Sequence, residues 1–199
     1  MRKIVFLDVD GTLIDYEGKL PESAARAVNE ARANGHKVYI CTGCSKAEIL
    51  ERKLCPLDGM IGGNGAYVED NDHVVMHHGL TKEEVKHIVD WCNERKLGFY
   101  LEANSGMYCN DYMYEQGPET LIKYSLGKGG DLEKAKQSAY SFIDCFIHLK
   151  GEDLYREDVN KISFILSSYQ DHLDSKVEFP TLEANTWGGK GELVVDQKK

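Results

Sequence analysis

The residues of this chain best suited to chemistry lie near the N-terminus, in the run DVDGTL at positions 8–13. Asp8 and Asp10 place two carboxylates two positions apart in the sequence, a pair that can hold a divalent cation and exchange protons with a substrate. Gly11 lets the backbone turn sharply against a ligand, and Thr12 adds a hydroxyl and an amide. Taken alone, the pair also fits a strand-ending turn in which an aspartate caps the loop.

A second candidate segment is Thr42-Gly43, which ends the next apolar run along the chain. Right-handed parallel crossovers bring successive strand ends to one edge of a sheet, so we expect Thr42 to face the same crevice as Asp8. A hydroxyl and loop amides at that edge suit phosphate oxygens. By itself Thr42 also fits an ordinary helix cap or loop residue, and its relation to the first motif is what favours a functional role.

Strands and helices must bring these two motifs together. Residues 2–7 form an apolar run that predicts a strand buried on both faces, a pattern typical of parallel sheets. A helix is predicted to start at Pro21, and residues 38–41 predict a second buried strand. Residues 46–53 predict a helix that must end before Pro56. The order βαβα indicates an α/β fold.

The regular alternation pauses after residue 60, and a second α/β module follows. Residues 66–69 and 73–77 predict a hairpin, and the capping box Thr81 to Glu84 predicts a helix that reaches about residue 96. Residues 98–101 and 107–110 predict a second hairpin, and residues 132–149 predict a helix. Four short strands are predicted at 162–166, 177–179, 182–184 and 192–195.

Composition narrows the classes of partner. The 199 residues, 42% of them hydrophobic, are enough to bury a core, and the formal charge of −9 argues against general nucleic-acid binding or an anionic membrane surface. No stretch has the roughly 20 apolar residues that a membrane span needs. The start MRKIVFL meets Asp8 too soon for a signal peptide, so we expect a cytoplasmic protein.

The six cysteines lack the compact spacing of a small secreted domain and are expected to be reduced thiols. Cys41 and Cys44 form a C-x-x-C pair, which leaves metal or redox use as an alternative. No second pair stands at a zinc-like distance, which favours the structural interpretation.

With both motifs in this strand context, the sequence resembles the haloacid dehalogenase-like (HAD) phosphohydrolases. Their first motif, D-x-D-G-T, matches residues 8–12, and their second, a Thr or Ser that ends the next core strand, matches Thr42. The segment Asn64-Gly65-Ala66 resembles the Cof-type subclass (IIB), in which a large α/β cap is inserted after the second motif. The resemblance implies an α/β fold with a Rossmann-like parallel-sheet core.

On that resemblance, we expect residues 1–80 to form the N-terminal part of the core and residues 81–190 the cap. Residues 191–199 are expected to form a strand that returns toward the core. The rest of the core is expected to be absent, which leaves an open sheet edge and an opportunity for self-association.

The resemblance also implies a two-step, magnesium-dependent phosphoryl transfer. Asp8 would attack phosphorus and carry the phosphoryl group, while Asp10 would protonate the leaving oxygen and then deprotonate water. Mg²⁺ would be held by the Asp8 carboxylate and the Asp10 carbonyl. The amides of Gly11 and Thr12, with the Thr42 hydroxyl, would steady the phosphate oxygens.

Two further residues complete the implied substrate site. Gly43 belongs to the phosphate-binding turn after the second strand, and Asn64 is expected near the mouth between core and cap, although Asn-Gly is also a common turn pair. The implied substrate is a small phosphorylated metabolite, such as a sugar phosphate, selected by the cap.

The sequence departs from the family pattern at two places. Cys44 stands where the subclass usually has an arginine after Thr-Gly, which puts any contact made by that arginine in question. The phosphate-screening lysine and the acidic motif expected after the cap are missing. Lys190 is a candidate for the lysine, but a turn lysine in the cap is the favoured interpretation.

These departures leave a second function open, a non-catalytic module that binds phosphate or a metabolite without turnover. A phospho-accepting receiver domain, which also uses aspartates at strand ends, fits poorly because of the Gly-Thr pair and the cap-sized insertion.

Overall fold

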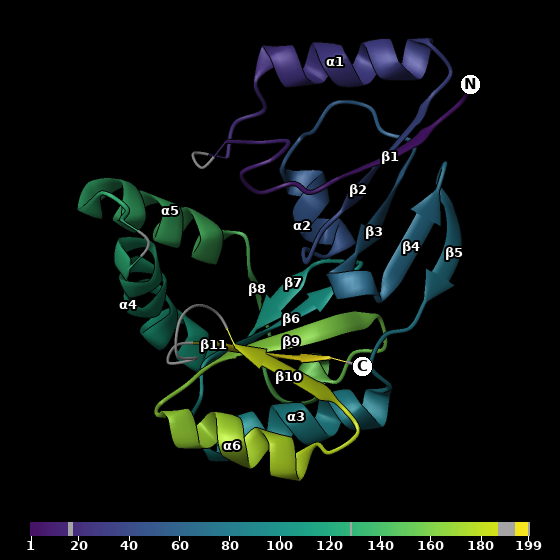
Figure 1. The fold of residues 1–199 in the computed structure, drawn as a ribbon. Coiled ribbons are helices and arrows are strands. Elements are labelled where there is room, and N and C mark those ends of the chain that lie inside the picture. The colour runs from purple at the N-terminus through teal and green to yellow at the C-terminus, as the bar shows by residue number, and fades with distance from the viewer. Residues whose placement is uncertain (16–17, 128, 187–193, 199) are drawn as a thin grey trace. The chain divides into compact units, whose positions relative to one another are not determined.

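A computed structural model describes residues 1–15, 18–127, 129–186 and 194–198. The chain forms two compact units, residues 1–78 and residues 79–199. Figure 1 labels the helices and strands of both. The division falls close to the expected end of the first domain, and assignment of the two units as core and cap stays a prediction.

The first unit is built on a five-stranded sheet in the order β1-β2-β3-β4-β5. Three parallel strands, β1 (Ile4–Leu7), β2 (Lys37–Cys41) and β3 (Gly59–Gly62), are followed by the antiparallel hairpin β4 (Tyr67–Asp70) and β5 (His73–His77). Two helices and a short 3-10 turn connect the strands: α1 (Glu22–Ala33), α2 (Lys46–Glu51) and η1 (Gly63–Gly65). The predicted βαβα order and the first hairpin are confirmed.

Helix α2 begins where its sequence dictates. Ser45 is the N-cap, and its hydroxyl accepts a hydrogen bond from the Glu48 amide at 3.3 Å. Ile49 is buried in the core of the first unit. The helix ends at Glu51 rather than at Lys53, because Lys53 adopts the left-handed conformation with φ of 48°.

Strand β1 differs from its prediction. It was expected to be buried on both faces, but the structure leaves Ile4 62% and Phe6 56% exposed. Only Val5 and Leu7 face the core of the unit. The reason is position: β1 is the outer strand of the described sheet and has β2 alone as a neighbour.

The second unit contains a six-stranded sheet in the order β10-β11-β9-β6-β7-β8. Its strands are β6 (Phe99–Ala103), β7 (Met107–Cys109), β8 (Ile147–His148), β9 (Val159–Ile165), β10 (Glu183–Thr186) and β11 (Val194–Lys198). All pairs are antiparallel except β7 with β8. The central strands β6 and β9 are buried along their whole length.

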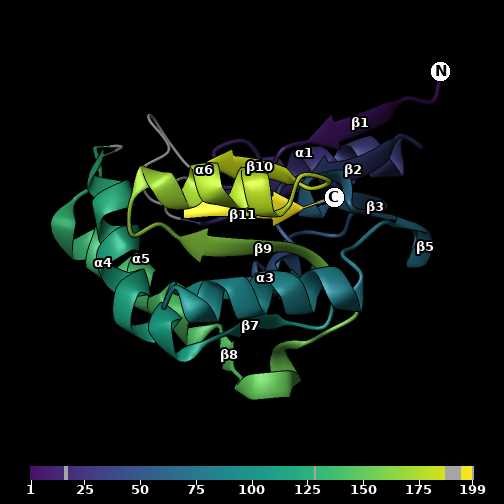
Figure 2. The same cartoon turned by 90° about the horizontal axis from the view of Figure 1, so that it is seen from below.

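Helices cover both faces of this sheet. Figures 1 and 2 show α3 (Lys82–Glu94) and α6 (Tyr169–Glu178) on one face of the sheet. Helices α4 (Asp111–Gly127) and α5 (Leu132–Asp144) lie on the other side. The 3-10 turn η2 (Gly151–Leu154) follows β8. Alternation along β6 explains the two cores, since Phe99 and Leu101 join one cluster and Tyr100 joins the other. The capping box predicted at Thr81 is present.

Several predicted elements of the second unit need correction. Residues 177–179 were expected to be a strand, but Val177 and Glu178 end helix α6, and Phe179 packs into the core. The helix predicted over 132–149 ends at Asp144, and α4 was not predicted at all. Of the segment expected to return toward the core, residues 194–198 form β11, which pairs with β9 and β10 of the second unit.

Two general expectations can be compared with the structure. All six cysteines are free thiols. Among the described residues, no helix is long and apolar enough to span a membrane.

Candidate functional site

The candidate site lies at one edge of the first unit's sheet, where three parallel strands end. The register pairs Leu7 with Ile40 and Cys41 with Ile61, so the residues that follow these strands emerge side by side. Asp8 follows β1, and Thr42 follows β2. The turn η1 follows β3 and contains Asn64. Open α/β sheets bind their ligands at this edge.

The loop after β1 folds back on itself and fixes Asp8. The amide of Leu13 donates to the carbonyls of Asp8 and Val9, at 3.2 and 3.0 Å. Gly11 adopts a φ of 75°, which lets the loop close without strain. The Thr12 hydroxyl donates to the Asp8 carboxylate at 3.4 Å. Asp8 is exposed to solvent, so an incoming substrate can reach its carboxylate.

The loop after β2 presents Thr42, whose side chain is buried while the neighbouring loop is half-exposed. The Thr42 amide donates to the Ile61 carbonyl at 2.9 Å, which ties this loop to β3. The Thr42 hydroxyl accepts a hydrogen bond from the Cys44 amide at 3.2 Å. The hydroxyl proton therefore remains available to donate to a ligand.

Gly43 and Asn64 are in close contact across two strand ends. A Cβ atom at position 43 would lie 2.8 Å from the Asn64 Oδ1 atom, so a larger residue would displace the Asn64 carboxamide. Asn64 has a left-handed backbone with φ of 55°, and its amide donates to the Thr42 carbonyl at 3.4 Å. The structure thus brings Thr42, Gly43 and Asn64 to one place.

Asp10 has partners that the sequence did not indicate. Its Oδ1 atom lies 2.8 Å from Nη1 of Arg52, and its Oδ2 atom accepts from the Cys44 thiol at 3.8 Å. Arg52 also pairs with Glu48 at 3.0 Å. The i,i+4 spacing of Glu48 and Arg52 on α2 was a usable signal for their own ion pair. Nothing in the sequence indicated that Arg52 reaches Asp10.

The electrostatics of this cluster favour a neutral thiol beside charged groups. Burial raises the pKa of the Cys44 thiol, and the Glu48 carboxylate adds to the effect. Burial opposes the charge of Arg52, but the Glu48 carboxylate outweighs burial and raises the guanidinium pKa. Arg52 is therefore a permanent cation at the site, and Cys44 has no thiolate character at neutral pH.

Asp8 and Asp10 supply only part of the coordination shell of a magnesium ion, so water molecules would have to supply the rest. Asp8 and Asp10 supply hard oxygen ligands of the kind that Mg²⁺ prefers, and Mg²⁺ is commonly held by one or two carboxylates. Over the described part of the chain, no group of three or more His, Cys, Asp or Glu side chains is placed to hold a metal ion. Lys190, the candidate for the phosphate-screening lysine, lies outside the described residues.

Comparison with protein families decides the assignment. The family model for haloacid dehalogenase-like hydrolases matches residues 5–190, nearly the whole chain. The chain belongs to this family. The motif residues 8–12 and the edge described above both lie within the matched range. The predicted family and α/β fold class are confirmed.

Relatives of known sequence cover only part of this hydrolase. It is 30% identical over 108 residues to YkrA of Bacillus subtilis, covering 53% of this chain and 41% of YkrA. It is 23% identical over 163 residues to the phosphatase YwpJ of the same organism, covering 76% of this chain and 57% of YwpJ. The chain therefore spans about half the length of these relatives.

Solved structures share the fold of the hydrolase over its full length. A protein from Geobacillus kaustophilus matches with a TM-score of 0.76 at 20% identity, covering 100% of this chain and 69% of that protein. The HAD subclass IIB sugar phosphatase BT4131 matches with a TM-score of 0.66 at 22% identity, covering 100% of this chain and 70% of BT4131. The Cof-type resemblance is thereby confirmed for the fold.

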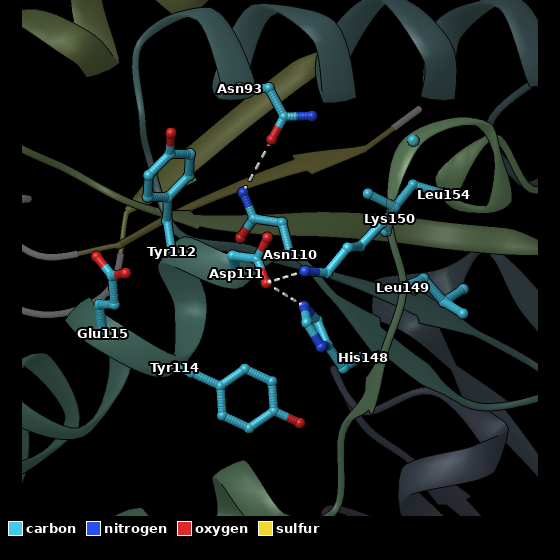
Figure 3. Close-up of a pocket in the computed structure, with 11 residues that line it drawn as sticks. Asn93, Asn110, Asp111, Tyr112, Tyr114, Glu115, His148, Leu149, Lys150 and Leu154 are labelled. Carbon is cyan, nitrogen blue, oxygen red and sulfur yellow. Dashed lines mark hydrogen bonds and ion pairs between the residues drawn. The ribbon is translucent and has the colours of Figure 1, made fainter.

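The second unit of the hydrolase contains a pocket of its own, of about 910 Å³, between the end of α3, the start of α4 and the segment around β8. Figure 3 shows Asp111 at its centre, where the carboxylate meets His148 at 2.6 Å and Lys150 at 3.3 Å. Asn110 donates a hydrogen bond to Asn93 Oδ1 at 3.1 Å in the same pocket.

Proposed function

We propose that the intact protein is a magnesium-dependent phosphohydrolase that acts on a small phosphorylated metabolite, and that the 199-residue chain is impaired as such an enzyme. The observation that carries the proposal is the convergence of Asp8, Asp10 and Thr42 at one sheet edge of a haloacid dehalogenase-like hydrolase. No other described part of the chain joins an exposed carboxylate to this set of phosphate-binding groups.

The reaction would proceed in two steps. An Asp8 carboxylate oxygen attacks phosphorus, the bond to the leaving oxygen breaks, and Asp10 gives its proton to that oxygen. Asp10 then takes a proton from water, and the resulting hydroxide displaces phosphate from the Asp8 aspartyl-phosphate. Both carboxylates return to their initial state, so the cycle balances.

The same edge would bind the phosphate group. The Gly11 and Thr12 amides and the Thr42 hydroxyl are the donors, and one such preorganised donor can contribute roughly 2.7–4 kcal/mol in a transition state. When bound by the Asp8 carboxylate and the Asp10 carbonyl, Mg²⁺ supplies positive charge that neutralises the transferring phosphoryl group. Gly43 and Asn64, which lie in close contact with each other, would complete this cradle.

A sugar phosphate is the substrate class that we favour. The support is the fold shared with BT4131, which is described as a sugar phosphatase. The second unit would then select the substrate, as a cap does.

The test is phosphate release by the intact protein from aryl and sugar phosphates, with and without Mg²⁺. Asp8→Asn should abolish release, because an amide cannot attack phosphorus. The matched control is Asp72→Asn, an exposed aspartate in the β4–β5 turn, which should leave release unchanged. Full activity of Asp8→Asn would overturn the proposal.

A non-catalytic binding module is the second candidate for this chain. The observation that favours it is the absence of a third metal-ligating side chain beside Asp8 and Asp10 in the described residues. Calorimetry with Mg²⁺ and inorganic phosphate distinguishes the two functions. Binding without turnover supports the module, and the absence of binding excludes it.

We also propose that the open edge of the first sheet supports self-association. The supporting observation is the exposure of Ile4 and Phe6 on β1. Sedimentation velocity of wild type and Ile4→Lys tests it, and identical monomeric behaviour of the two proteins would contradict it.

A further inference from the structure

Arg52 is the cation of the first unit that touches the candidate acid. It is the C-cap residue of α2, and its side chain is 25% exposed. Nη1 meets Asp10 at 2.8 Å, and Nη2 meets Glu48 at 3.0 Å. The guanidinium is a rigid planar fork, so the two contacts fix its orientation.

The partners of Arg52 differ in their freedom. Glu48 is 13% exposed in its side chain, and its amide is held by the Ser45 cap. Asp10 is 55% exposed and lies on the loop that turns at Gly11. Glu48 therefore holds Arg52 to α2, and Arg52 in turn holds Asp10. Without the guanidinium, an aspartate this exposed would sample several side-chain rotamers.

The two oxygens of Asp10 have different surroundings. Oδ1 forms the ion pair with Arg52, whereas Oδ2 accepts only a long contact of 3.8 Å from the Cys44 thiol. A thiol is a weak donor, so Oδ2 is easily given up to a stronger partner. The carboxylate is thus oriented with one oxygen anchored and one oxygen available for proton exchange.

We propose that Arg52 is a positioning residue for Asp10, which anchors Oδ1 from α2 and leaves Oδ2 to exchange the proton. The proposal rests on the proposed phosphohydrolase function. In the first step, the proton leaves Asp10 Oδ2 for the leaving-group oxygen as the bond from that oxygen to phosphorus breaks. In the second step, Oδ2 takes a proton from the attacking water. Arg52 exchanges no proton in either step.

Leaving-group dependence tests this role. Protonation matters for an alkyl phosphate, whose alkoxide is a poor leaving group, and matters little for 2,4-dinitrophenyl phosphate. General acid catalysis contributes roughly 10²–10⁴-fold, so we expect Arg52→Gln to lose about 10- to 100-fold in kcat/KM with the alkyl phosphate. With the dinitrophenyl ester the loss should stay below about threefold. Arg52→Lys should recover part of the loss.

The matched control is Arg26→Gln on α1. Arg26 also pairs with a glutamate one turn earlier, Glu22, at 3.8 Å, but it lies away from Asp10. It should leave both substrates unaffected. Equal losses with both substrates, or no loss with either, would overturn the positioning role of Arg52.

A double-mutant cycle gives a readout that does not depend on turnover. Asp10→Asn, Arg52→Gln and their combination are compared by hydrogen exchange of the β2–β3 peptides in the full chain. Hydrogen exchange reports the equilibrium constant for local opening of these peptides. For a partly exposed ion pair, the effect of the double variant on this constant should differ by roughly two- to fivefold from the combined effects of the two single variants. Its absence would overturn the proposal while leaving the phosphohydrolase function intact. If the intact wild-type protein hydrolyses neither ester, the proposed function fails, and the catalytic role of Arg52 fails with it.

Discussion

The two units of the molecule bury their sheets to very different extents. In the second unit, every residue of β6 and β9 is buried, and two clusters of apolar side chains fill the two faces. In the first unit, β1 alternates between exposed and half-buried residues, and all five residues of β5 are exposed. The candidate reactive residues are carried by the less buried unit.

The difference shows that the exposed candidate residues of this chain lie in its less buried unit. Asp8, Asp10 and Asn64 are all exposed, as groups that must meet substrate and water need to be. In the second unit the buried acid Glu102 is already paired with Lys161 at 3.0 Å. We therefore expect the second unit to be the more stable one, and the first unit to unfold at lower urea concentration.

The largest expected effect is in the second unit. Phe99→Ala removes a fully buried ring from the main core and should cost about 3–5 kcal/mol. Trp91 is buried in the main core of this unit, so its fluorescence in urea follows the unfolding of this unit. A shift below about 1 kcal/mol would contradict the comparison.

The next effect concerns a buried ion pair in the first unit. Asp58 accepts from the Val38 amide at 2.8 Å and from Arg32 at 3.1 Å. Burial opposes ionisation of Asp58, but the Val38 and Arg32 contacts outweigh it and hold the pKa of Asp58 below its usual range. Asp58→Asn should lower the free energy of unfolding of the first unit by about 1–3 kcal/mol. The measurement is circular dichroism in urea, because residues 1–78 contain no tryptophan.

The same residue predicts a pH dependence. Because its folded pKa is lowered, the stabilisation by Asp58 is fully present above the unfolded pKa of about 3.9 and is lost as the pH falls through the folded value. The difference between wild type and Asp58→Asn should therefore shrink below about pH 4. The control is Asp72→Asn, which removes a carboxylate at an exposed turn.

A smaller effect on stability is expected at the candidate site. In Gly43→Ala, the new methyl group would lie 2.8 Å from Asn64 Oδ1 and displace that carboxamide. We expect a loss of at most about 1 kcal/mol, with weaker binding of inorganic phosphate measured by calorimetry. Adding Asn64→Gly removes the collision and should restore the stability. Restored stability without restored phosphate affinity would show that Asn64 itself contacts the ligand.

The smallest effect is expected at the open edge. Phe6→Ala removes a ring that is 56% exposed and should change stability by about 0.5 kcal/mol or less. The measurement is the circular-dichroism transition of the first unit. A loss as large as that of Phe99→Ala would show that β1 is covered in solution, and would remove the contrast between the two units.

The sequence predicted the elements whose signals are local. The capping box at Thr81, the strands β2 and β9, and both hairpins follow from residue type and spacing. The predicted burial of β2 is wrong at its end, where Cys41 is exposed. Helix α4 was not predicted because Pro118 and Gly117 interrupt its pattern; Gly117 is buried where a Cβ would lie 2.7 Å from Ile143. Strand β1 was predicted with the wrong burial because exposure depends on which neighbours a strand has, and apolar composition does not encode them.

Only part of the candidate site could be predicted, because the sequence records local signals but not the packing of distant segments. Asp8 and Thr42 could be placed at one edge because parallel crossovers have a fixed hand. The contact between Arg52 and Asp10 depends on how far a long side chain reaches from the end of α2, which no motif spacing records. The approach of Gly43 to Asn64 likewise depends on three-dimensional packing of two loops.

The parallel pairing of β1 has a consequence for the order of folding. Ile4 pairs with Lys37 across the whole α1 crossover, whereas β4 and β5 are joined by a tight turn and pair locally. Of the pairings in this sheet, the one that brings in Asp8 closes the longest loop, and contacts of this kind form slowly. Asp8 is thus expected to reach its place late, so, on the proposed function, a nascent or partly folded chain would not yet hydrolyse the metabolites around it.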